Sequence, residues 1–206
     1  MTGDQVALRD GSIVLIRAVE PTDARLLDDG FARLSAQSRQ LRFLTGKPSL
    51  TSAEVHYFTE VDHHGHEALG AVDPGDGAGL GIARYIRRAE DPNGAEVAVT
   101  VTDAWQRRGL ATELLRRLAD RARQEGIHYF TALIADDNTA VDGMLDHSRG
   151  DVSVTHRESG TVEYEITLPP RGLGDGLHSL LRAFGRRQLK APDPISEALA
   201  ELTPRG

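Results

Sequence analysis

A short run of polar and small residues, Gln106–Ala111, has the composition of a phosphate-binding segment. It reads Gln-Arg-Arg-Gly-Leu-Ala. The first backbone N–H groups of a helix have no intrahelical partner and carry the positive end of the helix dipole. If a helix begins here, Gly109 and Ala111 leave room for a diphosphate to approach those groups, and two arginines add positive charge. The run taken alone is equally compatible with an ordinary strand-to-helix connection that carries exposed arginines.

Periodicity on both sides of this run indicates a strand that leads into a helix. In Glu96–Thr102, valines alternate with other residues, which is the period of a strand. After the turn Asp103–Trp105, apolar residues recur at helical spacing as far as about Gln124. They are Leu110, Leu114, Leu115, Leu118 and Ala122.

Gln106–Ala111 also matches the Q/R-x-x-G-x-G/A acyl-CoA signature of GNAT-family N-acetyltransferases, and it lies between strand and helix as that family requires. The segments Leu8–Leu27 and Arg33–Leu44, with the run LSAQSRQLRF, resemble the acetyltransferase domain of bacterial protein-lysine acetyltransferases. The resemblance spans about Leu8–Leu168. It implies an α/β (α+β) GNAT fold, with a mixed, mostly antiparallel central sheet flanked by helices. The cyclic-nucleotide-binding or acyl-CoA-synthetase domain often fused to those enzymes is not expected in this chain.

The implied activity is transfer of an acetyl group from acetyl-CoA to a primary amine, with a protein lysine as the leading acceptor. In the resembled enzymes, a glutamate at the position of Glu96 takes the proton from the amine. A glutamate with a pKa near ~4.3 is a weak base for a lysine near ~10.4, so burial or a relaying water must assist. The alternative is that Glu96 pairs with a nearby arginine.

The resemblance also implies a set of cofactor-binding positions. The strand before the motif is splayed by a bulge in GNAT folds, and the Val99 N–H would then bind the developing oxyanion. Asn138 matches an asparagine that bonds the pantetheine arm or the helix start, although it could be a simple helix cap. Leu145 stands where many members have a tyrosine acid, but a thiol with pKa ~8.5 is a tolerable leaving group without one. The expected cofactor-binding residues are Val99, Val101, Gln106, Arg107, Arg108, Gly109, Leu110, Ala111, Thr112 and Asn138.

A histidine-rich turn, Asp62–His66, raises a metal hypothesis. Metal sites usually draw ligands from separate elements at set spacing, and no second cluster is visible. We therefore interpret the segment as a polar turn and expect no metal.

The remaining segments follow the order of strands and helices in a GNAT domain. Thr22 or Asp23 is the expected cap of the first helix. After Pro169-Pro170, a basic amphipathic helix could touch a membrane, an acidic partner or a dimer mate, although packing on its own domain is preferred. We thus expect a GNAT domain over 1–170, and a C-terminal helix with a loosely ordered tail over 171–206. The expected elements are strands within Val6–Arg17, helices from Pro21, from Ser35 to about Phe43 and over Ser52–Phe58, a hairpin of Glu67–Val72 and Gly79–Arg87, a strand at Tyr129–Ile134, a helix at Thr139–His147, and a hairpin of Val152–His156 and Thr161–Leu168.

Composition narrows the function classes. The 206 residues include no cysteine, which excludes disulfides, thiolate metal sites and a cysteine nucleophile. The formal net charge of −7 argues against nucleic-acid binding by the chain as a whole. No apolar run approaches the ~20 residues of a membrane span, and the N-terminus has no signal-peptide core, so a cytoplasmic protein is expected.

Two other functions are compatible with the sequence. One is an N-acetyltransferase for a small amine, which would favour an enclosed acidic acceptor pocket over a shallow open groove. The other is a non-catalytic acyl-CoA-binding sensor, because fold does not determine function.

Overall fold

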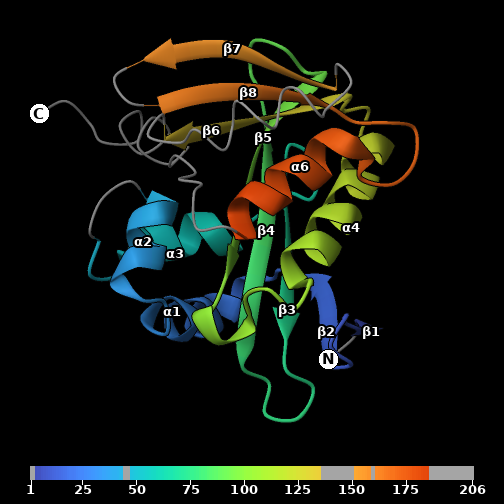
Figure 1. Cartoon of the computed structure of the whole chain (residues 1–206). Helices are drawn as coiled ribbons and strands as arrows, with labels where there is room; N and C mark the ends of the chain where they lie inside the picture. Colours follow the sequence, from blue (N-terminus) through green and yellow to red (C-terminus); the bar gives the residue numbers. More distant parts are fainter. Residues whose placement is uncertain (1–2, 44–46, 136–150, 159–160, 186–206) are drawn as a thin grey trace, which may run out of the picture.

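The computed structural model describes residues 3–43, 47–135, 151–158 and 161–185 (Figure 1). Within these residues, eight strands form one sheet in the order β1-β2-β3-β4-β5-β6-β8-β7. All neighbouring strands are antiparallel except β5 and β6, which are parallel. The strands are β1 (Asp4–Ala7), β2 (Ile13–Ala18), β3 (His66–Val72), β4 (Gly79–Arg87), β5 (Gly94–Val101), β6 (Tyr129–Ala135), β7 (Val152–Glu158) and β8 (Thr161–Thr167).

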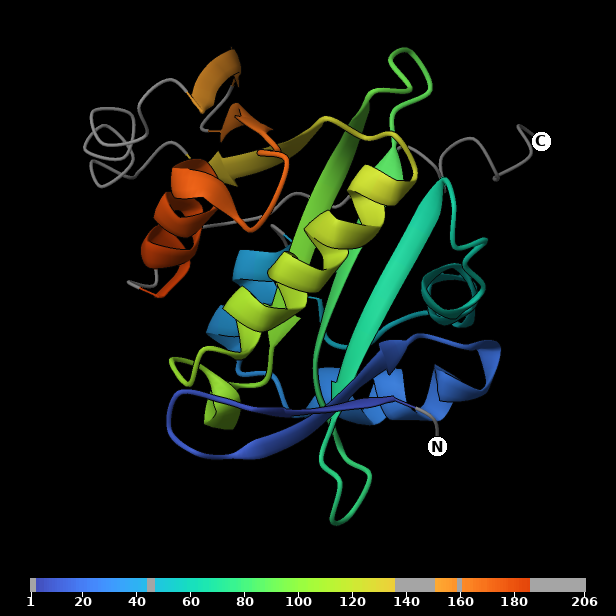
Figure 2. The same ribbon diagram turned by 90° about the vertical axis from the view of Figure 1, so that its right-hand side faces the viewer.

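Helices cover both faces of this sheet, α1, α2 and α3 on one side and α4 and α6 on the other (Figures 1 and 2). The mixed, mostly antiparallel sheet flanked by helices confirms the expected fold class. The helical elements are η1 (Pro21–Asp23), α1 (Ala24–Ala32), α2 (Ala36–Phe43), α3 (Ser52–Thr59), η2 (Asp103–Trp105), α4 (Leu110–Gln124) and α6 (Gly174–Gly185).

The main core lies between the sheet and the pair α4 and α6. Helix α4 buries one face because its apolar residues recur every three or four positions. Each fully buried leucine of this kind contributes about 1.5–3 kcal/mol relative to an exposed one. Leu173 and Leu177 join the same core, so α6 packs against α4 and β8. The buried residues of α4 are Leu110, Leu114, Leu115, Leu118, Ala119 and Ala122.

The ends of the helices show which local predictions are correct. Gly126 adopts a left-handed φ of 76° and ends α4 as expected, with Ile127 N–H donating to the Ala122 carbonyl at 2.9 Å. Asp23 precedes α1, but its side chain does not cap this helix. The carboxylate of Asp23 accepts from Arg17 at 2.5 and 2.6 Å and, in the capping box of η1, from the Glu20 N–H at 2.9 Å. Asp23 thus occupies the predicted N-cap position of α1, but its side chain caps the start of η1 instead.

Four of the predictions fall on residues that the structure does not describe. The expected helix at Thr139–His147 lies outside the described residues, as does the tail after residue 185. The same holds for Asn138 and Leu145. No helix in the described part of the chain is long and apolar enough to cross a bilayer.

Candidate functional site

The centre of the candidate site is a fork between the two parallel strands. β5 and β6 pair only from Gly94↔Tyr129 to Glu96↔Thr131, although both strands continue beyond this point. Glu96 is therefore the last β5 residue in register with β6, and it stands where the strands separate. The register of β5 with β4 is continuous, so the bulge expected in this strand is not present in that pair. The opening arises because β6 leaves β5.

The backbone of β5 presents alternate N–H groups to this opening. The Thr102 N–H donates to the Leu80 carbonyl of the β4 segment at 2.9 Å. Because N–H groups of successive strand residues point to opposite neighbours, those of Val99 and Val101 point toward the β6 side. The Val101 carbonyl accepts from Gln106 Nε2 at 3.1 Å, which agrees with this direction. Two valine N–H groups thus face the space between the separating strands.

The loop that follows β5 brings further N–H groups to a second point. Arg107 and Gly109 have left-handed backbones, with φ of 65° and 93°. Such a conformation turns neighbouring N–H groups toward a common anion position. The N–H groups of Leu110, Ala111 and Thr112 have no intrahelical partner because they lie in the first turn of α4. No side chain caps this helix. The structure therefore places, in the loop after the fork, a helix start whose N–H groups are suited to bind an anion.

The side chains of the predicted motif have different surroundings. Gln106 Nε2 bonds the Val101 carbonyl and lies 3.3 Å from Ser38 Oγ, so this side chain holds the loop rather than projecting from it. Arg108 lies 3.4 Å from Asp10 Oδ2, and its guanidinium lies over the Trp105 ring. The side chain of Leu110 is buried in the core, which leaves its backbone N–H as its possible contribution to binding.

Glu96 faces the sheet side that carries α1, α2 and α3. It is half-buried, and it is in register with Ile86 of β4 and Thr131 of β6. Thr131 is in turn in register with Glu165 of β8, so the three polar side chains share one face. A carboxylate therefore stands at the fork, on the face opposite α4.

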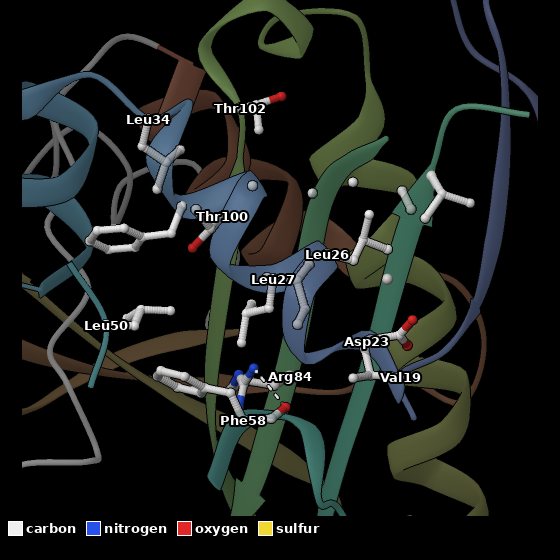
Figure 3. A pocket seen from close by; sticks show the side chains of 18 of the residues that line it. Val19, Asp23, Leu26, Leu27, Leu34, Leu50, Phe58, Arg84, Thr100 and Thr102 are labelled. Carbon is white, nitrogen blue, oxygen red and sulfur yellow. Dashed lines mark hydrogen bonds between the residues drawn. The ribbon is translucent and has the colours of Figure 1, made fainter. Parts of the chain in front are cut away.

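The same face holds an apolar pocket between α1 and strands β2 to β5 (Figure 3). Its volume is about 100 Å³. Asp23 is the acidic residue of its wall, and this carboxylate is paired with Arg17. The guanidinium of Arg84 lies 4.1 Å from the centre of the Phe58 ring and donates to the Phe58 carbonyl. The charged groups of the wall are thus paired, and the space between them is apolar.

The histidine-rich turn directs its side chains to different partners. His63 Nδ1 lies 2.8 Å from Glu67, and His64 Nδ1 lies 3.1 Å from Glu125. His66 Nε2 lies 3.3 Å from the guanidinium of Arg84. Burial, together with the positive charge of Arg84, lowers the pKa of His66 to about 4, so this imidazole is neutral at pH 7. Among the described residues, no group of three or more His, Asp or Glu side chains could hold a metal ion.

Two tyrosines in the described part of the chain, Tyr129 and Tyr164, bear on the catalytic acid because Leu145 stands at the family's tyrosine position. Tyr129 donates to Asp91 at 2.6 Å, and this hydrogen bond, with burial, raises the pKa of Tyr129 to about 12. Tyr164 is buried in the main core. Neither contact supports a role for these tyrosines as the acid.

A polar network that the sequence did not indicate joins α2 to the loop. Asp103 accepts from the Ser35 backbone N–H and hydroxyl at 2.9 and 2.8 Å, and from the Ser38 hydroxyl at 3.0 Å. The Ser38 hydroxyl oxygen also lies near Gln106 Nε2. Burial opposes ionisation of Asp103, but the hydrogen bonds outweigh it and lower the pKa of this carboxyl. Asp103 thereby fixes the start of α2 next to the helix start of α4.

We expect Asp103→Asn to lower the free energy of unfolding by about 1 kcal/mol at pH 7, because a charge-assisted hydrogen-bond acceptor is lost. Since the folded pKa lies below the ordinary 3.8, the wild-type advantage exists above pH 3.8 and is lost as pH falls through the folded pKa. Urea unfolding at pH 7 and near pH 3 measures both effects. Asp29→Asn, at an exposed site on α1, is the control. Equal stabilities of Asp103→Asn and wild type at pH 7 would contradict the role.

Comparison with known proteins identifies the family. The model of the acetyltransferase (GNAT) family matches residues 36–150, which is more than half of the chain and includes the fork and the loop. This chain belongs to the GNAT family. GNAT enzymes are acetyltransferases that take their acetyl group from acetyl-CoA.

Individual relatives agree with this assignment. Acetyltransferase Pat of Mycolicibacterium smegmatis is 30% identical over 165 residues, which cover 80% of this chain and 49% of Pat. The chain thus spans about half the length of that relative. Acetyltransferase PA5475 of Pseudomonas aeruginosa is 32% identical over 68% of this chain and 74% of its own. The solved GNAT domain of S. lividans PAT superposes with a TM-score of 0.70 at 30% identity, over 81% of this chain and 97% of that domain.

Proposed function

We propose that this GNAT enzyme transfers the acetyl group of acetyl-CoA to the side-chain amine of a protein lysine, with Glu96 as the general base. The observation that carries this proposal is the position of Glu96 at the fork, where β5 and β6 separate. In this position a carboxylate stands beside the opening into which the Val99 N–H points. The likeness to Acetyltransferase Pat and to the GNAT domain of PAT supports a protein acetyltransferase.

Each group has one role in the proposed reaction. The N–H groups at the start of α4, with Arg107 and Gly109, would hold the phosphates of the donor. Acetyl-CoA supplies a thioester. Glu96 accepts a proton from the acceptor ammonium, after which a C–N bond forms as the C–S bond breaks and the CoA thiol leaves. The Val99 N–H stabilises the negative charge that develops on the carbonyl oxygen.

The described surroundings of Glu96 support a lysine side chain better than a small polyamine. A polyamine site requires several unpaired carboxylates in an enclosed pocket, whereas the pocket on this face is apolar and its Asp23 is paired with Arg17. Ser153, Thr155 and His156 of the edge strand β7, beyond β6 and β8 in the same sheet, are exposed, which is compatible with an open approach for a peptide.

The proposal predicts release of free CoA from acetyl-CoA in the presence of lysine peptides. An array of lysine peptides and small amines, read by CoA release and by mass spectrometry of the acetylated product, measures this. Peptides in which lysine is replaced by arginine are the control, because they keep the charge but not the acceptor amine. Release with small amines alone would move the assignment to a small-molecule acetyltransferase. Acetyl-CoA binding without turnover on any amine would favour a sensor.

Several expectations stay predictions. These are the cytoplasmic location, the possible homodimer, and the division into a domain over 1–170 and an extension over 171–206. The contact of α6 with the main core shows only how the described part of that extension packs.

A further inference from the structure

The turn between β1 and β2 lies against the start of α4. A Cβ atom built on Gly109 would lie 3.3 Å from Arg9 Cγ, 3.4 Å from Arg9 Cδ and 3.7 Å from Arg9 Nε. The side chain of Arg9 therefore crosses directly over the left-handed glycine that precedes α4. These two residues are 100 positions apart in the sequence, and nothing in the local pattern links them.

The guanidinium of Arg9 differs from its neighbours in its contacts. Arg108 is anchored to the same turn, with Asp10 Oδ2 and Ser12 Oγ each 3.4 Å from its Nη1. By contrast, no hydrogen bond or ion pair holds Arg9 within the described residues, and Arg9 is exposed. Its aliphatic stem rests on Gly109, while its charged end remains available at the start of the helix.

Positive charge is in excess at the start of α4. Arg9 lies over the residue before the uncapped helix start, Arg108 pairs with Asp10 of the turn, and the exposed Arg107 precedes α4 by three positions. Glu113 in the first turn of α4 is occupied by Arg116 and Arg117. Together with the free N–H groups of α4, the surplus of guanidinium groups favours a multiply charged anion.

We propose that Arg9 is an additional coenzyme-binding residue, which reaches over Gly109 from the β1–β2 turn to contact a phosphate group of CoA. The anion is either the diphosphate or the 3′-phosphate, which present the same chemistry to a guanidinium. This inference rests on the proposed coenzyme site at the start of α4. It adds a residue from a separate element, so that the site is closed by the N-terminal hairpin as well as by the loop after β5.

Calorimetric titration with CoA tests the proposal without any need for turnover. Arg9→Met keeps an unbranched stem on Gly109 but removes the charge, and we expect it to weaken CoA binding about tenfold, as for loss of a charge-assisted hydrogen bond. Arg25→Met is the matched control, because Arg25 is an exposed arginine of α1 with 94% of its side chain accessible. Thermal unfolding of each variant shows that both are folded. Titration with 3′-dephospho-CoA distinguishes the two phosphates.

Each outcome has a defined meaning. A loss of affinity for CoA in Arg9→Met alone supports the proposal. If Arg9→Met also binds 3′-dephospho-CoA more weakly than wild type does, Arg9 contacts the diphosphate. If the two proteins bind 3′-dephospho-CoA equally, Arg9 contacts the 3′-phosphate. Equal CoA affinities of Arg9→Met and wild type would overturn the role of Arg9 while the proposed site stands. Wild-type protein that fails to bind CoA would overturn both.

Discussion

Replacing Glu96 by glutamine should lower kcat by about 10²- to 10⁴-fold, the usual contribution of a general base, and leave the affinity for acetyl-CoA nearly unchanged. The amide of glutamine has nearly the same shape as the carboxylate but cannot accept a proton at neutral pH. The affinity should persist because the phosphates would bind at α4, on the other side of the fork from the Glu96 side chain. Steady-state kinetics with a lysine peptide and calorimetry with CoA measure the two quantities separately.

Glu125→Gln provides the matched control for this experiment. Glu125 is also partly buried, with 22% of its side chain accessible, but it lies at the far end of α4 and pairs with His64. Its replacement should leave kcat within about twofold of wild type, as for a group outside the reaction. Unchanged turnover in Glu96→Gln would remove Glu96 from the mechanism, and a loss of CoA affinity would indicate a structural role instead.

Replacing Gly109 by alanine should weaken CoA binding by about 10- to 100-fold, through strain of about 1–2 kcal/mol and through loss of space. The φ of 93° at Gly109 is one that residues with a Cβ rarely adopt. The added Cβ would also lie 3.3 Å from Arg9, which forces that side chain to move. If the loop shifted to relieve the backbone strain and the contact with Arg9, its N–H groups would turn away from their common position.

Gly126→Ala separates the loss of binding from simple strain. Gly126 ends the same helix, has a φ of 76°, and its Cβ would meet nothing within 4 Å. Both variants should lose a similar amount of stability in urea unfolding, about 1–2 kcal/mol, but only Gly109→Ala should lose affinity for CoA. If Gly109→Ala bound CoA as tightly as Gly126→Ala, the loop before α4 would not be the coenzyme site.

The strand, loop and helix that carry the motif could be predicted from the sequence because their determinants are local. Alternating valines specify a strand, apolar residues at helical spacing specify α4, and Gly126 ends it. The resemblance to GNAT enzymes then located Glu96 and the loop after β5, and the family match includes both positions. Asp23 occupies the predicted N-cap position, but its side chain does not cap α1, because its carboxylate binds Arg17, six residues earlier, and the Glu20 N–H of the preceding turn.

What the sequence by itself determined is therefore the identity and order of the elements, the family, and the residues of the motif. Tertiary structure alone decided that β6 leaves β5 after Glu96, that Asp103 binds the start of α2, and that Arg9 crosses Gly109. The last two contacts join residues 68 and 100 positions apart, and Glu96 is 35 positions from its β6 partner Thr131. Periodicity and turn chemistry report only on neighbours within a few residues, so they carry no information about such pairs until the sheet brings them together.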